Sequence, residues 1–325
     1  MTPATQSDTA VAGGARADLD PSSRLIIEEA ERRGISVELL APRAEYFRLR
    51  HGERAIVCRE SLSELTSAVA LSLCDDKRTT ARVLRAAGLH TPEQVEAGSS
   101  AQNEAFLQRL GQVVVKPARG EQGRGISIGI RTPAALAWAI DRATEVSTPV
   151  LLEEVVHGDD LRLLVIGHEV VAGAIRRPPT VCGDGQQTIA ALIAAASERR
   201  KAETDGASQI PLDAETHRCV QEAGYALTDV LPRAQWLTVR GAANVHLGGT
   251  IHDVTAQLHP TLVEVAQRAS RALNIPVVGL DLMVRSIGGS DYWILEANER
   301  PGLANHEPQP TAARFLDLLF PGSSR

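Results

Sequence analysis

The chain has 325 residues, a formal net charge of −6 and 43% hydrophobic residues, so it can build cores for about two domains and is not globally disordered. The acidic balance and an aromatic content of only 3% do not provide the basic surface or the stacking side chains of a nucleic-acid binder. We therefore expect no nucleic acid partner. No apolar stretch approaches the ~18 residues of a membrane-spanning helix, so no membrane partner is expected either.

The N-terminus and the cysteines indicate the cellular compartment. Residues 1–20 are rich in small and polar residues without an apolar core, which predicts a disordered tail and not a signal peptide. The four cysteines, Cys58, Cys74, Cys182 and Cys219, are far apart and form no C-x-x-C pair. They favour reduced thiols in a cytoplasmic protein over a disulfide frame or a zinc site.

Helix and strand patterns alternate along the rest of the chain and predict an α+β or α/β protein. The polar, aperiodic stretch 197–210 predicts a mobile loop, and the break at 90–92 predicts a domain boundary. The expected elements, in chain order, are a helix at 21–33, a strand at 35–40, a hairpin at 46–58, helices at 61–74 and 77–87, a short helix at 102–110, a strand at 113–116, a glycine-rich turn at 120–125, a strand at 126–130, a helix at 133–143, strands at 149–156 and 161–171, a helix at 261–273, strands at 275–284 and 292–297, and a helix at 311–320.

Two acids near the C-terminus share one predicted hairpin. Asp281 and Glu296 lie in its two strands, and a Gly-Gly pair at 288–289 lies between them. A two-residue turn at positive φ on this pair, followed by an unbroken register, places Asp281 opposite Glu296, and the strand period adds Asn298 to the same face. Three hard oxygen donors of this kind suit Mg²⁺. The alternative is a solvated strand face that carries two acids by chance.

A glycine-rich loop follows the predicted strand that ends at Lys116. Gly120, Gly123 and Gly125 would allow backbone N–H groups to converge on an anion, and Lys116 would add a point charge. The strand–loop–strand context differs from a P-loop and from a dinucleotide-binding turn. A phosphate site is one interpretation of this loop, and an ordinary hairpin turn is the other.

Acidic residues surround an apolar pair at the end of the strand 149–156. Glu153, Glu154 and Asp160 could meet a sugar hydroxyl or a purine amine. The backbone of Val155 and Val156 could meet the edge of an adenine. A solvated strand end would explain the same residues.

Residues 125–129 match G-x-S-x-G, the nucleophile elbow of a hydrolase. The elbow requires a helix directly after the serine, but Ser127 lies in an alternating β-branched run with no helix before Pro133. This context disfavours a serine hydrolase. His246, His252 and His259 lack the spacing of metal ligands on a helix.

Taken in order, these segments resemble the ATP-grasp superfamily of carboxylate–amine ligases. The resemblance rests on Asp76-Lys77, on 115–117 with the glycine loop, on 153–160, on Asp281 and on Glu296-x-Asn298-x-x-Pro301-Gly302. Segments 177–189 and 244–255 are similar to the ATP-grasp part of cyanophycin synthetase. Segments 58–65 and 298–308 are similar to that of N-acetylglutaminylglutamine synthetase, a bacterial osmolyte enzyme. The resemblance covers about residues 23–320, and both families carry further domains.

The resemblance implies an α+β protein with the ATP-grasp fold, in which two α+β subdomains clasp ATP after a short N-terminal α/β region. The corresponding divisions are an N-terminal region at 21–92, a lid subdomain at 93–160 and a C-terminal subdomain at 161–321. The implied cofactors are ATP and two Mg²⁺ ions, with Mn²⁺ as an alternative ion. The implied contacts are Lys77 and Lys116 to the phosphates, Gly120, Gly123 and Gly125 in a lid loop, Glu153, Val155 and Val156 at the adenine, Asp160 at the ribose, and Asp281, Glu296 and Asn298 at the metal ions.

The implied reaction forms an amide or peptide bond. A substrate carboxylate attacks the γ-phosphate of ATP, and an amine then displaces phosphate from the acyl phosphate. The protein would mainly position the reactants and neutralise charge. The candidate catalytic residues are Arg162, Arg177, Asn244 and Arg300, and surface ion pairs are the alternative interpretation of the arginines.

The expected substrates are glutamine- or glutamate-like amino acids or a dipeptide osmolyte. A homodimer and a separate acetyltransferase or amidotransferase of the same pathway are candidate partners. One alternative is a ligase of the cyanophycin, glutathione or ribosomal-protein glutamate branch; the segment 183–188 speaks against a D-alanine ligase. The other alternative is a non-catalytic ATP-binding subunit, which the presence of Lys116 and three metal ligands disfavours.

Overall fold

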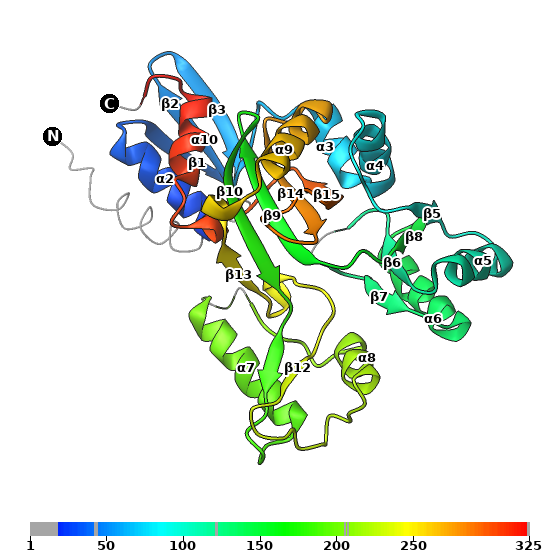
Figure 1. Ribbon diagram of the computed structural model, residues 1–325. Helices are drawn as coiled ribbons and strands as arrows, with labels where there is room; N and C mark the ends of the chain where they lie inside the picture. Colours follow the sequence, from blue (N-terminus) through cyan, green and yellow to red (C-terminus); the bar gives the residue numbers. More distant parts are fainter. Residues whose placement is uncertain (1–18, 42–44, 121–122, 205, 207, 324–325) are drawn as a thin grey trace.

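The computed structural model describes residues 19–323 apart from 42–44, 121–122, 205 and 207 (Figure 1). The strands of these residues form four sheets, and every strand pair within them is antiparallel. The largest is a five-stranded middle sheet. Within the described part of the chain, no helix combines the length and the apolar composition needed to cross a membrane.

The N-terminal sheet packs against the first and last helices of the chain. Helix α2 (Pro21–Arg32) begins where Asp20 accepts a hydrogen bond from the Ser22 amide at 2.7 Å, as an N-cap residue does. Leu19 is 4% exposed, so the predicted tail is wrong for residues 19 and 20, and its remainder lies outside the described residues. Helix α10 (Thr311–Leu319) lies beside α2 (Figure 1). The strands are β1 (Ser36–Ala41), β2 (Tyr46–His51), β3 (Arg54–Arg59) and β4 (Leu62–Ser63).

The middle sheet is buried on both faces. Its strand order is β13-β10-β9-β14-β15. Along β9, Leu163 and Val165 pack under helices α4 and α9, while Leu164 and Ile166 face α2 and α10. This two-sided burial explains the nearly continuous apolar run of the strand. The elements are β9 (Asp159–Ile166), β10 (Glu169–Arg177), β13 (Thr250–Asp253), β14 (Val277–Val284), β15 (Tyr292–Asn298), α3 (Ala68–Asp75), α4 (Lys77–Ala86) and α9 (Pro260–Ala272).

A smaller peripheral sheet extends to one side of the middle sheet (Figure 1). Its order is β5-β8-β6-β7, and helices α5 and α6 contribute to its core. Helix α5 begins with a capping box formed by Ser99 and Gln102 and ends at Gly111, whose φ of 75° suits a glycine. The elements are β5 (Gln94–Glu96), β6 (Val113–Pro117), β7 (Ser127–Ile130), β8 (Val150–Glu154), α5 (Ser100–Leu110) and α6 (Pro133–Thr144).

An insert between β10 and β13 has a core of its own, formed by residues such as Val181, Ile193 and Leu237. It contains β11 (Thr180–Cys182), α7 (Ile189–Glu203), α8 (Ala214–Glu222) and β12 (Trp236–Thr238). The predicted loop 197–210 is wrong for residues 197–203, which are helical. Thr188 caps an alanine-rich helix, and good helix formers such as Glu, Arg and Lys continue it without apolar periodicity. The predicted helix at 61–74 is also shorter, because β4 occupies its first turn.

Candidate active site

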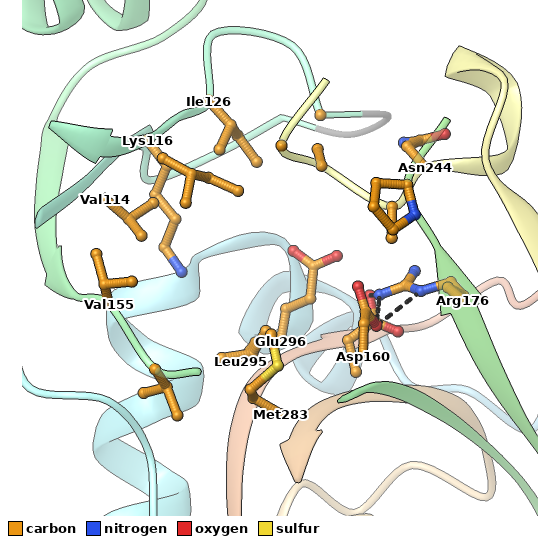
Figure 2. Close-up of a pocket in the computed structure, with 18 of the residues that line it drawn as sticks. Val114, Lys116, Ile126, Val155, Asp160, Arg176, Asn244, Met283, Leu295 and Glu296 are labelled. Atoms are coloured by element: carbon orange, nitrogen blue, oxygen red, sulfur yellow. Dashed lines mark hydrogen bonds and ion pairs between the residues drawn. The ribbon is translucent and has the colours of Figure 1, made fainter. Parts of the chain in front are cut away.

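A cavity of about 310 Å³ separates the peripheral sheet from the middle sheet (Figure 2). Apolar side chains from both sheets form opposite walls, and charged side chains line one end. From the peripheral side come Val114 and Ile126, and from the middle sheet come Met283 and Leu295. A slot with two apolar walls fits a flat aromatic ring.

The backbone segment 153–156 joins these walls, and all four of its residues line the cavity. The predicted adenine contact Glu153 has a different partner in the structure. Its carboxylate accepts the Lys116 ammonium at 2.7 Å, and both side chains are at least nine-tenths buried. The backbone of Val155 and Val156 is thus left as the polar edge of this part of the cavity.

The predicted pairing of Asp281 with Glu296 is confirmed, but the predicted turn is wrong. Neither Gly288 nor Gly289 has a positive φ. The connection runs from 285 to 291, with Gly289 donating to the Ser286 carbonyl at 3.0 Å. Near this turn Leu282 pairs with Ile294, and the register then shifts before Asp281 pairs with Glu296.

The register shift is a β-bulge at Leu295, which has no partner on β14. In a regular strand, successive side chains point to opposite faces. Leu295 and Glu296 instead both line the cavity. The bulge therefore supplies one wall residue and one carboxylate from adjacent positions, which is how bulges redirect side chains.

Asp281 is held by two arginines. Its Oδ1 accepts from Arg162 at 2.5 Å, and its Oδ2 lies 3.0 Å from Arg176 Nη2. Burial by itself raises the pKa of this carboxyl, but the two guanidinium groups outweigh burial and hold the pKa well below its usual range. Asp281 is therefore ionised at neutral pH although it is 3% exposed.

The donor set fits a hard cation. Asn298 Nδ2 lies 3.5 Å from both Asp281 Oδ2 and Glu296 Oε1, so these two carboxylate oxygens are separated by no more than twice that distance. The three side chains converge on one point, and carboxylate and amide oxygens are the ligands that Mg²⁺ prefers. An amide flip would present the Asn298 oxygen in place of its nitrogen. Within the described residues, no group of three His, Cys, Asp or Glu side chains could hold a metal ion; the third donor of the present set is the amide of Asn298.

The glycine loop approaches this cluster from the peripheral sheet. Gly120, Gly123 and Gly125 have φ values of 126°, 73° and 70°, which favour glycine. Lys77 Nζ donates to the Gly120 carbonyl at 2.7 Å and lies 3.6 Å from Glu296 Oε2. Lys77 thus links the loop to the carboxylates; residues 121 and 122 of the loop lie outside the described residues.

Sequence reasoning missed Arg176, which lines the cavity beside the predicted Arg177. Arg176 also binds Asp160 at 2.7 Å, whereas Arg177 pairs with Asp159 and is 53% exposed. Ile175 is buried in the core on the opposite face from Arg176, so the two-residue period of the strand was a usable signal for Arg176. Arg177, the last residue of β10, also lines the cavity.

Asp160, expected at a ribose, lies beside Arg176 at the cavity. Burial is the main cause that raises its pKa to about 6, and the Asp281 charge adds to the effect while Arg176 opposes it. The carboxyl pair Asp160–Asp281 therefore takes up a proton at Asp160 as the pH falls to about 6.

The remaining predicted residues lie around this centre. Asn244 lines the cavity, and its side chain accepts from the His246 amide at 2.8 Å. Arg300 lies in an adjacent cavity of about 360 Å³ that also contains Lys77 and Glu296, and it pairs with Glu60 at 3.0 Å. Ser127 is fully buried in β7, which rules out the nucleophile elbow.

An antiparallel middle sheet and a peripheral sheet enclose this cavity, with the buried Lys116 in its wall and the buried Lys77 beside Glu296. This arrangement is typical of the ATP-grasp class of proteins. No protein-family model matches the chain. The chain is 32% identical over 320 residues to the cyanophycin synthetase of Trichormus variabilis, covering 94% of this chain and 35% of the relative. It is 26% identical over 325 residues to the glutathione biosynthesis bifunctional protein GshAB of Mannheimia succiniciproducens, with coverages of 94% and 43%.

The solved bifunctional glutathione synthetase from Pasteurella multocida shares the fold, with a TM-score of 0.66 and 23% identity over 95% of this chain and 44% of that one. The similarities to these relatives and to the solved structure support the ATP-grasp superfamily of carboxylate–amine ligases as the family of this chain. It spans roughly two fifths or less of the length of the cyanophycin synthetases that it matches.

Proposed function

We propose that the protein is an ATP- and Mg²⁺-dependent ligase that forms a carbon–nitrogen bond through an acyl phosphate. One observation carries this proposal: Asp281, Glu296 and Asn298 converge beside a cavity whose two apolar walls fit an adenine. A nucleotide lying in this cavity would have its phosphates near Lys77, Lys116 and the glycine loop. Two Mg²⁺ ions on the carboxylates would neutralise the phosphates and stabilise developing charge.

The positions of the lysines and arginines suggest their separate roles. Lys116 enters the cavity wall and would contact the inner phosphates, while Lys77 bridges the loop and Glu296. Arg162 and Arg176 keep Asp281 ionised and positioned, so we assign them a supporting role around the acid. Arg176 replaces Arg177 in this proposal. Arg300, in the adjacent cavity, would orient the substrate carboxylate.

The reacting groups of the substrates would occupy the adjacent polar cavity beside Glu296. It is lined by acids and by two cations, Lys77 and Arg300, which suits an amino acid or short peptide carrying both charges. Glutamine- or glutamate-like substrates remain our proposal. The relatives, a cyanophycin synthetase and a bifunctional glutathione biosynthesis protein, favour a cyanophycin- or glutathione-type branch as the second candidate.

Release of ADP and phosphate tests the proposal. The purified protein would be incubated with ATP, Mg²⁺ and glutamine, glutamate, arginine, aspartate or small acylated peptides, and products would be identified by mass spectrometry. We expect amine-dependent ADP release and a product linked by one new amide bond, both lost in Glu296→Gln. Tight ATP binding without amine-dependent ADP release for any substrate would instead favour a non-catalytic ATP-binding subunit.

A further inference from the structure

A third cavity, of about 450 Å³, lies in the insert, where α7 faces β11, β12 and the end of β10. We call it the basic groove, because its charged lining residues are Arg177, Arg199, Arg200 and Glu203. Three cations against one acid leave a formal surplus of positive charge. Arg199, Arg200 and Glu203 do not line the nucleotide cavity or the polar cavity beside it.

Arg200 forms the inner end of this groove. Its Nη2 donates to the Gly249 carbonyl at 2.7 Å, its Nη1 lies 3.1 Å from Glu203, and its side chain is only 21% exposed. Its Nε is shielded from solvent and has no hydrogen-bond partner in the described part of the chain. Because Arg200 lines the groove and its side chain is still 21% exposed, a ligand in the groove would meet the accessible part of this side chain, not the shielded Nε.

Arg199 and Arg177 flank the entrance. Arg199 is exposed and forms no ion pair with a described residue, while Arg177 holds Asp159 at 2.6 Å but remains 53% exposed. Guanidinium groups match the planar fork of a carboxylate. Apolar surface from Pro178, Pro179 and Ile210 lies between these cations, which suits a ligand whose charged groups are carried on an aliphatic chain.

The groove adjoins the nucleotide cavity. Arg177 and Pro178 line both spaces. Gly249 approaches the backbone between them so closely that a Cβ there would lie 2.9 Å from the Arg177 carbonyl and 2.8 Å from the Asn244 carbonyl. Asn244 lines the nucleotide cavity. A ligand in the groove would therefore end at Arg177, beside the nucleotide cavity.

We propose that the basic groove binds the carboxylate-bearing, non-reacting end of a peptide substrate. That the ligand is a substrate rests on the proposed ligase function. That it carries carboxylates rests on the three arginines Arg177, Arg199 and Arg200. The groove volume falls in the range of small-ligand sites, and a di- or tripeptide with acidic side chains would fill it. The selectivity would be for carboxylates over uncharged amides of the same length.

Binding of tri-glutamate, measured by calorimetry in the presence of Mg²⁺ and a non-hydrolysable ATP analogue, tests the proposal. N-acetylated, C-amidated tri-glutamine is the neutral control peptide. We expect tri-glutamate to bind and Arg199→Glu to weaken it about tenfold, because reversing one charge removes an attraction and adds a repulsion. Arg233→Glu is the matched variant: the same charge change on an exposed arginine of the insert that does not line the groove. It should bind as the parent does.

A second variant covers the buried arginine. Arg200→Ala removes the bond to Gly249 as well as the charge, so Arg200→Lys, which keeps the charge but loses the planar fork, is measured beside it. We expect Arg200→Lys to bind the nucleotide analogue as the parent does and tri-glutamate several-fold more weakly. Unchanged tri-glutamate affinity in both Arg199→Glu and Arg200→Lys would overturn the assignment.

Two further outcomes separate the alternatives. Equal binding of the neutral peptide, or complete displacement of tri-glutamate by inorganic phosphate at a similar concentration, would show that the groove does not select peptide carboxylates and would overturn the proposal. Retained, Arg199-dependent peptide binding in a protein that never releases ADP would remove the ligase function and leave the groove as a peptide site. The two failures are therefore distinguishable.

Discussion

Arg176 on β10 reaches across β9 to Asp281 on β14, where its Nη2 lies 3.0 Å from Asp281 Oδ2. The same guanidinium binds Asp160 at 2.7 Å. Arg162 on β9 binds the other oxygen of Asp281. Asp281 is therefore part of a buried charge network. Glu296 on the neighbouring strand is partly exposed, and its ion pair with Lys77 is long, at 3.6 Å.

This asymmetry predicts different outcomes for the two acids. Asp281→Ala should lower the free energy of unfolding by about 3–5 kcal/mol, because it leaves two buried guanidinium groups without their acid. Glu296→Ala should change it by about 1 kcal/mol or less. Both should abolish turnover. Urea unfolding in EDTA measures the stabilities, and an equal loss for the two variants would contradict the network described here.

Because Lys116 and Glu153 form a buried ion pair, we expect variants of this pair to affect protein stability and nucleotide binding differently. Lys116→Met leaves a buried carboxylate alone and should cost about 3–5 kcal/mol of stability. Lys116→Met combined with Glu153→Gln should recover most of that loss, since neither partner then carries a charge. Nucleotide affinity should stay low in both. Recovery of ATP binding in the double variant, seen by calorimetry, would show that Lys116 does not contact phosphates.

Two glycines of the peripheral sheet provide a matched comparison. Gly125 and Gly129 have φ values of 70° and 76°, but only at Gly125 would a Cβ meet neighbours, with Val146 Cγ2 at 3.0 Å and the Ala143 Cα at 3.3 Å. Gly129→Ala should cost about 1–2 kcal/mol from the backbone alone. Gly125→Ala should cost more and should also weaken nucleotide binding, because the loop cannot keep its path. Thermal unfolding and nucleotide titration of the pair would reveal the difference.

Asp160 predicts a pH dependence of stability. Burial, the main cause, raises its folded pKa to about 6 from an ordinary value of 3.8. Because the pKa is raised, the folded state keeps the Asp160 proton to a higher pH than the unfolded state does. The resulting contribution to the free energy of unfolding is fully present below pH ~4 and is lost as the pH rises through about 6. The parent should thus lose about 1–3 kcal/mol relative to Asp160→Asn across this window. Chemical unfolding at several pH values in EDTA measures it, and parallel curves would exclude the shift.

The hairpin shows how a local pattern can predict the right contact through the wrong turn. A Gly-Gly turn at 288–289 predicts that Asp281 faces Glu296, and the two residues do pair. The observed connection is longer than the predicted two-residue turn. Between this connection and the bulge, the strand pairing is offset by one residue from the predicted register. The bulge at Leu295 restores the predicted register. Nothing in the local sequence distinguishes Leu295 as a bulge, because the bulge depends on fitting both Leu295 and Glu296 to one cavity.

Local chemistry was sufficient to predict most elements, the glycine loop and the residue types of the candidate site. Helix caps, strand alternation and positive-φ glycines act over a few residues, so a single sequence reveals them. Which charged side chains pair with each other was decided only by the tertiary structure. Glu153 is taken by Lys116, Asp281 by Arg162 and Arg176, and the polar stretch 197–203 is helical on a core that the insert supplies. The Arg162–Asp281 pair joins residues 119 positions apart in the sequence. The energies of such pairs depend on burial that arises only when the sheets assemble.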